Sequence, residues 1–130
     1  MLEVGLYAFL AADSGLSALV GTRIYPLLLP QEPTLPAVVY QRISTNPLGH
    51  SNDGPDHLVR VRMQFRCHAA TLLAAKGLAD AVRAALDGYQ GLMGTVDVKG
   101  VFRVDEGDDD EPETATFSVR ADYYIVFNEA

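Results

Sequence analysis

The sequence predicts an α+β domain spanning residues 1–130, with a mainly antiparallel sheet of four or more strands and two main helices packed on one face. Two observations indicate the sheet: apolar and polar residues alternate along Leu58–His68, and again along Thr114–Asn128. A third indicates the helical layer, because Thr71–Leu86 is rich in Ala and Leu and repeats its apolar residues at helical spacing. A chain of 130 residues is long enough to bury one core.

The strand at Leu58–His68 has the clearest alternation in the chain. Its apolar residues fall on the side where we expect the core: Val59, Val61, Met63, Phe65 and Cys67. The opposite side carries three arginines and no acid: Arg60, Arg62, Gln64, Arg66 and His68. A solvated protein surface normally intersperses both signs of charge, so this face needs a separate explanation.

The N-terminal half begins with helical segments and then becomes extended. The spacing of apolar residues predicts an amphipathic helix over residues 2–12. Asp13 or Ser14 then suits the N-cap of a second short helical turn, which carries Leu16, Leu19 and Val20 and is closed by Gly21. Four prolines at positions 26, 30, 33 and 36 exclude a helix interior and a central strand, so we expect a connector along the surface or across a sheet edge. The β-branched and aromatic segment Ala37–Ser44 predicts a strand.

Residues 45–57 are dense in Asn, Pro, Gly, Ser and Asp, which predicts a mobile loop between two strands. Loops of about a dozen residues are uncommon in compact domains unless they bind something. We therefore treat this segment as a candidate docking loop, with these candidate contact residues: Asn46, Leu48, His50, Asn52 and Asp53.

The C-terminal half repeats the pattern of helix followed by two strands. Gly88 ends the helix predicted over Thr71–Leu86, and residues 88–94 read as a turn region. Val96–Asp105 predicts a strand, in which Gly100 favours a bulge. A second mobile loop is expected at 105–113, before the closing strand Thr114–Asn128. Because both strand pairs are sequential, antiparallel pairing is the natural arrangement.

The net charge of −7 is concentrated in one segment. Residues 105–113 hold 7 of the 17 acids and no base, so the rest of the chain has 10 acids against 10 Lys and Arg. The run lacks the alternate acids and central Gly of a calcium-binding EF-hand loop. A solvated acidic loop is the simplest interpretation, while weak divalent-ion binding and repulsion of DNA remain open.

The sequence shows no constellation for catalysis. It lacks G-x-S-x-G, a Walker loop and G-x-G-x-x-G, and its three histidines and one cysteine lack the spacing of a zinc site. Cys67 lies on the apolar side of its strand, so we expect a small core residue rather than a nucleophile. No apolar run reaches the roughly 18 residues that span a membrane. We expect no enzyme activity, no metal, no cofactor and no membrane partner.

Three interpretations of Arg60, Arg62 and Arg66 remain open at this point. They could bind nucleic acid, although the aromatic residues that interleave with basic residues in single-strand binders are absent. They could pair with acids on neighbouring strands, for example Asp122. They could also meet acids of another subunit, since arginine is enriched at protein interfaces, which makes them candidate subunit-interface residues.

The order of these signals resembles the small tail-completion proteins of long-tailed bacteriophages, also called tail terminator or tail-to-head joining proteins. The resemblance rests on Leu16–Pro26 (LSALVGTRIYP) and Pro36–Ser44 (PAVVYQRIS), followed by the arginine-bearing strand, the helix and an aromatic closing strand at Tyr123–Phe127. It covers nearly the whole chain. The shared motifs are structural rather than catalytic.

The resemblance implies a virion protein without enzyme activity, assembled in the host cytoplasm and placed at the head-proximal end of the tail. Such proteins form a ring, expected to be hexameric, that caps the tail tube, stops its polymerisation and joins the tail to the head connector. Partners would be further copies of the chain, the major tail tube protein and connector proteins, with DNA passing through without specific binding. The alternative is a small cytoplasmic module that binds a peptide or ligand.

Within that ring, the acidic segment is a candidate for facing the lumen or the next ring. Negative charge there would repel DNA as it passes. The candidate residues are Asp105, Glu106, Asp108, Asp109, Asp110 and Glu111.

Overall fold

The computed structural model describes residues 1–31, 33–48, 58–111 and 116–128, and the side chains of these residues except those of 109–111. Helices and strands follow one another in the order α1, α2, β1, β2, β3, α3, β4, β5, β6. Their bounds are α1 Leu2–Ala12, α2 Ser14–Val20, β1 Ile24–Pro26, β2 Ala37–Pro47, β3 Leu58–Ala69, α3 Leu72–Leu86, β4 Gly91–Met93, β5 Val96–Glu111 and β6 Thr116–Asn128.

The strands form one mixed sheet in the order β1-β2-β3-β6-β5-β4. β1 pairs in parallel with β2, whereas every other pair of neighbours in this order is antiparallel. The α+β class predicted from the sequence is therefore correct, and the parallel β1 makes the sheet mixed. The four long strands β2, β3, β6 and β5 form its centre.

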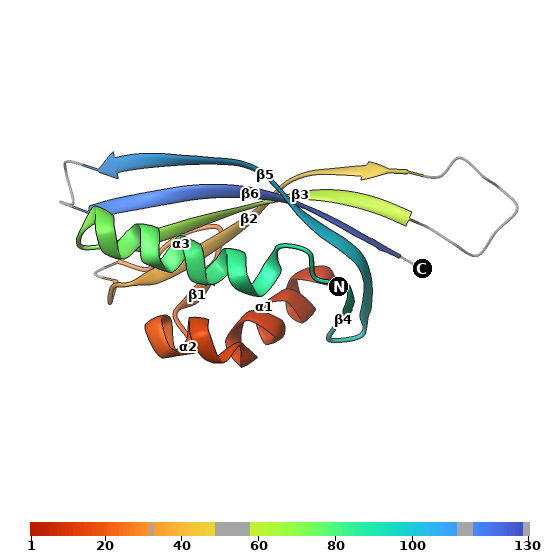
Figure 1. The fold of residues 1–130 in the computed structure, drawn as a ribbon, viewed down its shortest axis with the longest axis horizontal. Coiled ribbons are helices and arrows are strands. Elements are labelled where there is room, and N and C mark those ends of the chain that lie inside the picture. Colours follow the sequence, from red (N-terminus) through yellow and green to blue (C-terminus); the bar gives the residue numbers. More distant parts are fainter. Residues whose placement is uncertain (32, 49–57, 112–115, 129–130) are drawn as a thin grey trace, which may run out of the picture.

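The helices lie on one side of the sheet in Figure 1. α3 packs over β3 and β6. Its buried residues recur at helical spacing and point into the core: Ala75, Leu78, Ala79, Val82 and Leu86. The side chain of Thr71 caps the first turn of α3 by accepting a hydrogen bond from the Ala74 N–H at 3.1 Å. α1 and α2 bury leucines and a valine in the same core.

β3 runs through the middle of the sheet, and the predicted alternation is confirmed from Leu58 to Cys67. His68, expected on the open side, is instead buried, with 5% of its surface exposed. The five apolar residues of β3, Val59, Val61, Met63, Phe65 and Cys67, are each at most 5% exposed. β6 lies beside β3 and supplies a matching row of apolar residues. In this row the Tyr123 ring packs edge to face on the Phe65 ring of β3, with 5.7 Å between the ring centres. The two central strands therefore supply the apolar sheet surface on which the helices pack.

Parts of both segments predicted as loops are strands. The loop expected at 45–57 is wrong for residues 45–47, because β2 continues to Pro47 and pairs with β3 as far as Pro47 opposite Val59. The loop expected at 105–113 is wrong for residues 105–111, which belong to β5 and pair with β6 through Glu111 opposite Thr116. Residues 49–57 and 112–113 lie outside the described residues.

Two short strands were missed because three residues give no detectable alternation. β1 lies at the start of the proline-rich connector and extends the sheet at its edge, which is where proline is tolerated. β4 lies in the predicted turn region and pairs with the first residues of β5. Glycines allow β4 to approach α1: a Cβ on Gly5 would overlap the Met93 carbonyl, and Gly94 has a φ of +61°.

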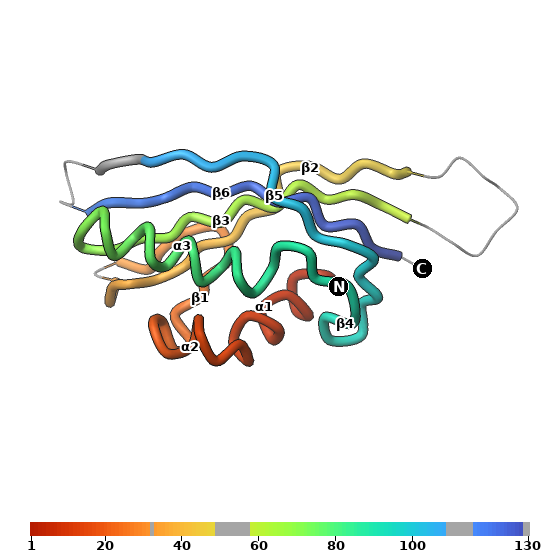
Figure 2. Tube along the Cα trace, in the orientation of Figure 1, coloured from red at the N-terminus to blue at the C-terminus, as the bar shows by residue number. Residues whose placement is uncertain are grey.

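The two long hairpins point in opposite directions along the sheet. In Figure 2 the end of β2 and the start of β3 lie at the right, whereas the end of β5 and the start of β6 lie at the left. β2 and β5 are the two outer strands of the four long ones, with β3 and β6 between them.

Candidate functional site

The sheet face that points away from the helices carries the arginines predicted from the sequence. On β3 and β6 we call this surface the arginine face; its residues are Arg60, Arg62, Gln64, Arg66, Arg120, Asp122 and Tyr124. Cross-strand partners share a face, so each β3 residue lies beside the β6 residue opposite it. The arginine face is thus built from two neighbouring strands.

Arg62 is engaged within the chain. Its Nε and Nη2 donate to Asp122 Oδ2 at 2.8 and 2.7 Å, and Gln64 Nε2 donates to Asp122 Oδ1 at 3.2 Å. Asp122 is only 4% exposed, so these three hydrogen bonds compensate a carboxylate withdrawn from water. The hydrogen bond that Arg62 donates to Asp122 raises the pKa of Arg62 above its usual value. Of the interpretations left open for this residue, the structure realises the intrachain ion pair.

The other two arginines have different surroundings. The Arg60 guanidinium carbon lies 4.3 Å from the centre of the Tyr124 ring, a cation–π contact across the two strands. Arg66 lines an open cavity of about 390 Å³ together with Gln41, His68 and residues of the proline-rich connector: Leu27, Leu28 and Leu29. The structure therefore brings the three arginines to one face but gives each its own environment.

The acidic segment is split between the two faces of β5. Asp105 lies opposite Asp122 in the register and belongs to the side of the arginine face. Asp108 faces the helices and forms an ion pair with Lys76 of α3 at 3.0 Å. Glu106 lies 3.7 Å from Arg103 of the same strand. Asp109, Asp110 and Glu111 continue the strand. The predicted candidate loop is a strand whose acids point both ways.

The other predicted docking residues are only partly described. Asn46 lies in β2 opposite Arg60, and the N–H of Leu48 donates to the carbonyl of Leu58 at 2.9 Å, extending the hairpin by one residue. His50, Asn52 and Asp53 lie outside the described residues.

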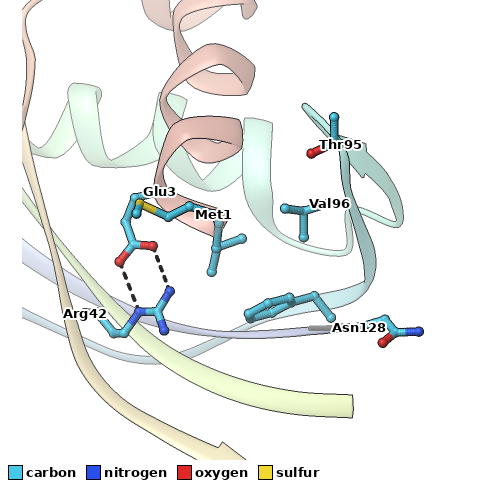
Figure 3. A pocket seen from close by; sticks show the side chains of 8 residues that line it. Met1, Glu3, Arg42, Thr95, Val96 and Asn128 are labelled. Carbon is cyan, nitrogen blue, oxygen red and sulfur yellow. Dashed lines mark hydrogen bonds and ion pairs between the residues drawn. The ribbon is translucent and has the colours of Figure 1, made fainter. Parts of the chain in front are cut away.

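Sequence reasoning missed an ion pair between α1 and β2. Arg42 donates through Nη2 and Nε to the two carboxylate oxygens of Glu3 at 2.7 and 3.1 Å, and this pair borders an open cavity of about 540 Å³ (Figure 3). The cavity is lined by Met1, Leu2, Glu3, Arg42, Thr95, Val96, Phe127 and Asn128. The two charged side chains that line the cavity, Glu3 and Arg42, bind each other. No sequence signal links residues 39 positions apart.

Cys67 is a buried core residue, as the alternation predicts. It is fully enclosed, and burial raises the pKa of its thiol to about 12. In the part of the chain that the structure describes, no group of three or more His, Cys, Asp and Glu residues could hold a metal ion.

No single helix within the described ranges is long and apolar enough to cross a membrane. α1 and α2 meet the length and composition requirement only when taken together, and they are bent by 85° at their junction. Their apolar residues lie in the core: Leu2, Leu6, Leu10, Leu16 and Val20.

Comparisons with known proteins identify a family. The family model of tail completion protein gp17 matches residues 4–128 of the chain. No curated protein sequence matches. Among solved structures, 17 chains match; one belongs to a structure described as the virion of a native gene transfer agent particle. That match covers 98% of this chain and 94% of the other, with a TM-score of 0.75 and 19% sequence identity, which establishes a shared fold.

Proposed function

Because the chain belongs to the tail completion protein gp17 family, we propose that it forms a ring, hexameric and head-proximal, that caps the tail tube and joins it to the head connector. The ring stops polymerisation of the major tail tube protein and offers the connector a surface to dock on. Assembly takes place in the host cytoplasm, and DNA passes through the ring without specific binding.

The observation that carries this proposal is the family match over residues 4–128, because it spans nearly the whole fold rather than one motif. It places the chain among the structural proteins of phage tails. The solved structure with the same fold comes from a phage-like virion particle, which supports the same role.

The architecture suits a ring subunit. A long sheet is covered by helices on one face and leaves the arginine face uncovered by helices (Figure 1). Arg60 and Arg66 remain candidates for contact with a second subunit. Arg62 contributes through its ion pair with Asp122, which holds two strands of that surface together. The acids of β5 give the chain the negative charge that would repel DNA in the lumen.

Electron microscopy of tails tests the proposal. Tails made without the protein should carry tubes of variable, extended length that fail to join heads, and supplying the protein should restore uniform length. Tubes of unchanged, uniform length in its absence would overturn the proposed function.

A further inference from the structure

The outer edge of β2 is covered over only part of its length. β1 pairs with Val38–Tyr40, and the N–H of Leu27 donates to the carbonyl of Tyr40 at 2.9 Å. Beyond that point no described residue forms a backbone hydrogen bond with the outer side of β2. We call the uncovered segment Gln41–Pro47 the β2 edge.

The outer edge of β5 is covered at the opposite end. β4 pairs with Val96–Val98, the N–H of Gly88 donates to the Val101 carbonyl at 2.9 Å, and Asp87 Oδ1 accepts from the N–H of Arg103 at 3.3 Å. After Arg103 no described residue outside β5 forms a hydrogen bond with its outward backbone groups. We call the uncovered segment Val104–Glu111 the β5 edge.

Alternation shows which groups these edges present. The N–H of Leu48 bonds inward to β3, so the backbone groups of Thr45 and Pro47 face outward. Proline has no N–H, so Thr45 is the last donor on the β2 edge. On β5, the N–H of Glu106 donates to Asp105 Oδ1 at 2.9 Å and is therefore occupied, so the donors open to a partner begin two residues later, at Asp108. Unpaired edges of this kind are ready templates for another strand.

The charges of the two edges are complementary. The β2 edge contains one base, Arg42, which is paired with Glu3, and no acid. β3 behind it adds three arginines, of which Arg62 is paired with Asp122, whereas the β5 edge contains six acids and no base. Lys76, Arg103 and Arg120 lie beside the β5 acids and offset part of this charge. Pairing like with like would oppose two acidic strands, which is unfavourable. Pairing the β5 edge with the β2 edge of another copy brings acids to arginines.

The direction of the strands allows this pairing to continue from copy to copy. β2 and β5 are antiparallel, because three antiparallel steps separate them through β3 and β6. A rotation about an axis nearly parallel to the strands preserves strand direction. β5 of one copy therefore meets β2 of the next in antiparallel orientation. Different surfaces then meet at every junction, which is the head-to-tail arrangement that closes rings.

The positions of the two edges fit a tilted ring of strands. Within one copy, the register places Val39 of β2 level with Gly107 of β5, and Ser44 level with Phe102. The β2 edge of one copy therefore lies opposite the β5 edge of the next only if the second copy is shifted along the strands by about four to five residues, or about 15 Å. Four strands are about 19 Å wide. The shift therefore corresponds to a strand tilt of about 40°, within the 35–45° typical of closed barrels.

We propose that neighbouring subunits of the ring join by antiparallel pairing of the β2 edge of one copy with the β5 edge of the next, which makes one continuous sheet around the ring. This inference rests on the proposed ring function and names the surface that builds it. The partner is a second copy of this chain.

Thr45→Pro tests the pairing with a matched control. Proline removes the outward N–H and leaves the bonds to β3 intact, whereas Thr45→Val keeps the N–H and loses the same side-chain bond to Arg42, 3.2 Å long in the structure. We expect Thr45→Pro to weaken subunit association by about tenfold, as for loss of one hydrogen bond at each junction, and to be depleted from purified tails. Thr45→Val should assemble as the natural protein does.

The readouts separate this inference from the proposed function. Melting temperature first shows that both variants fold, and the amount of protein on purified tails then reports assembly. Thr45→Pro present on tails at the natural level would overturn the edge pairing while leaving the ring function in place. Unchanged tube length without any protein would instead overturn the function. Raising the salt concentration from about 0.05 to 0.5 M should weaken assembly of the natural protein more than assembly of the Glu106→Gln variant, which lacks one acid of the β5 edge. Equal weakening of both proteins would contradict the charge complementarity.

Discussion

Tyr123→Phe should make the protein more stable, because it removes a buried hydroxyl that has no hydrogen-bond partner among the described residues. Tyr123 is fully enclosed, and its ring packs edge to face on Phe65, a contact that phenylalanine preserves. Leaving a buried polar group unsatisfied costs about 1–3 kcal/mol. For a chain of this size, 1 kcal/mol corresponds to about 4 °C in Tm, so we expect the variant to melt several degrees higher.

The same substitution should change the response to alkali. Burial raises the pKa of Tyr123 above the unfolded value of 10.0, so the folded state favours the neutral phenol. The contribution of Tyr123 to stability is therefore fully present below pH 10 and declines as the pH rises above it, because only the unfolded chain then ionises at this residue. The advantage of Tyr123→Phe should grow above pH 10.

Tyr89→Phe is the matched control. The hydroxyl of Tyr89 donates to the Leu92 carbonyl at 2.6 Å, so its removal loses a hydrogen bond and should lower the free energy of unfolding by about 1 kcal/mol. Urea unfolding measures both variants on one scale. A Tyr123→Phe protein that is less stable than the natural one would refute the reasoning, since it would mean that the hydroxyl has a stabilising partner.

Three further outcomes follow from the packing. Gly5→Ala should lower the free energy of unfolding by about 1–3 kcal/mol, because a Cβ there overlaps the β4 backbone. Gly77→Ala should raise the free energy of unfolding by about 1 kcal/mol, because a Cβ there meets open space and alanine favours a helix. Urea unfolding of both variants distinguishes the steric effect from a general effect of replacing glycine. Arg62→Glu should lower Tm by facing a second carboxylate toward Asp122, and an unchanged Tm with failed assembly would place this arginine at a subunit interface instead. Cys67 should resist a thiol reagent until the protein unfolds, and its raised pKa should cost stability as the pH rises above 9.0; fast labelling of the folded protein would contradict its burial.

The central strands could be predicted from the sequence because burial imposes alternation on them. Every second residue of β3 must be apolar to face the core, and the same holds for β6, so the periodicity directly reflects the structure. Helix α3 was predictable for the same reason, through the helical spacing of its buried residues.

The second half of β5 could not be predicted, because no core lies beneath it. Residues 105–111 are held in the sheet by backbone pairing with β6, which places no demand on side-chain polarity. The length of the closing strand does indicate it: a strand of 13 residues in a hairpin needs a partner of similar length, and β5 has 16. The same argument would have extended β2 toward Pro47.

The contacts of the arginine face depended on register, which one strand alone does not specify. Alternation predicts that Arg60, Arg62 and Arg66 share a face, and Asp122 is one of the acids that the sequence offers as a partner. Only the pairing of β3 with β6 shows that Arg62 reaches Asp122 while Arg60 lies over Tyr124. The Glu3–Arg42 ion pair likewise could not be predicted from the sequence, because it depends on how α1 packs beside β2.

Chemical cross-linking of the two edges tests the head-to-tail ring most directly. Cys67 is the only cysteine of the chain and is fully buried, so cysteines added at Thr45 and Glu106 can be joined selectively by a short bifunctional thiol reagent. On purified tails, the double variant Thr45→Cys with Glu106→Cys should give a ladder of covalent species that ends at the size of the closed ring, while each single variant stays monomeric. Dimers from a single variant, or no species above the monomer from the double variant, would contradict the account.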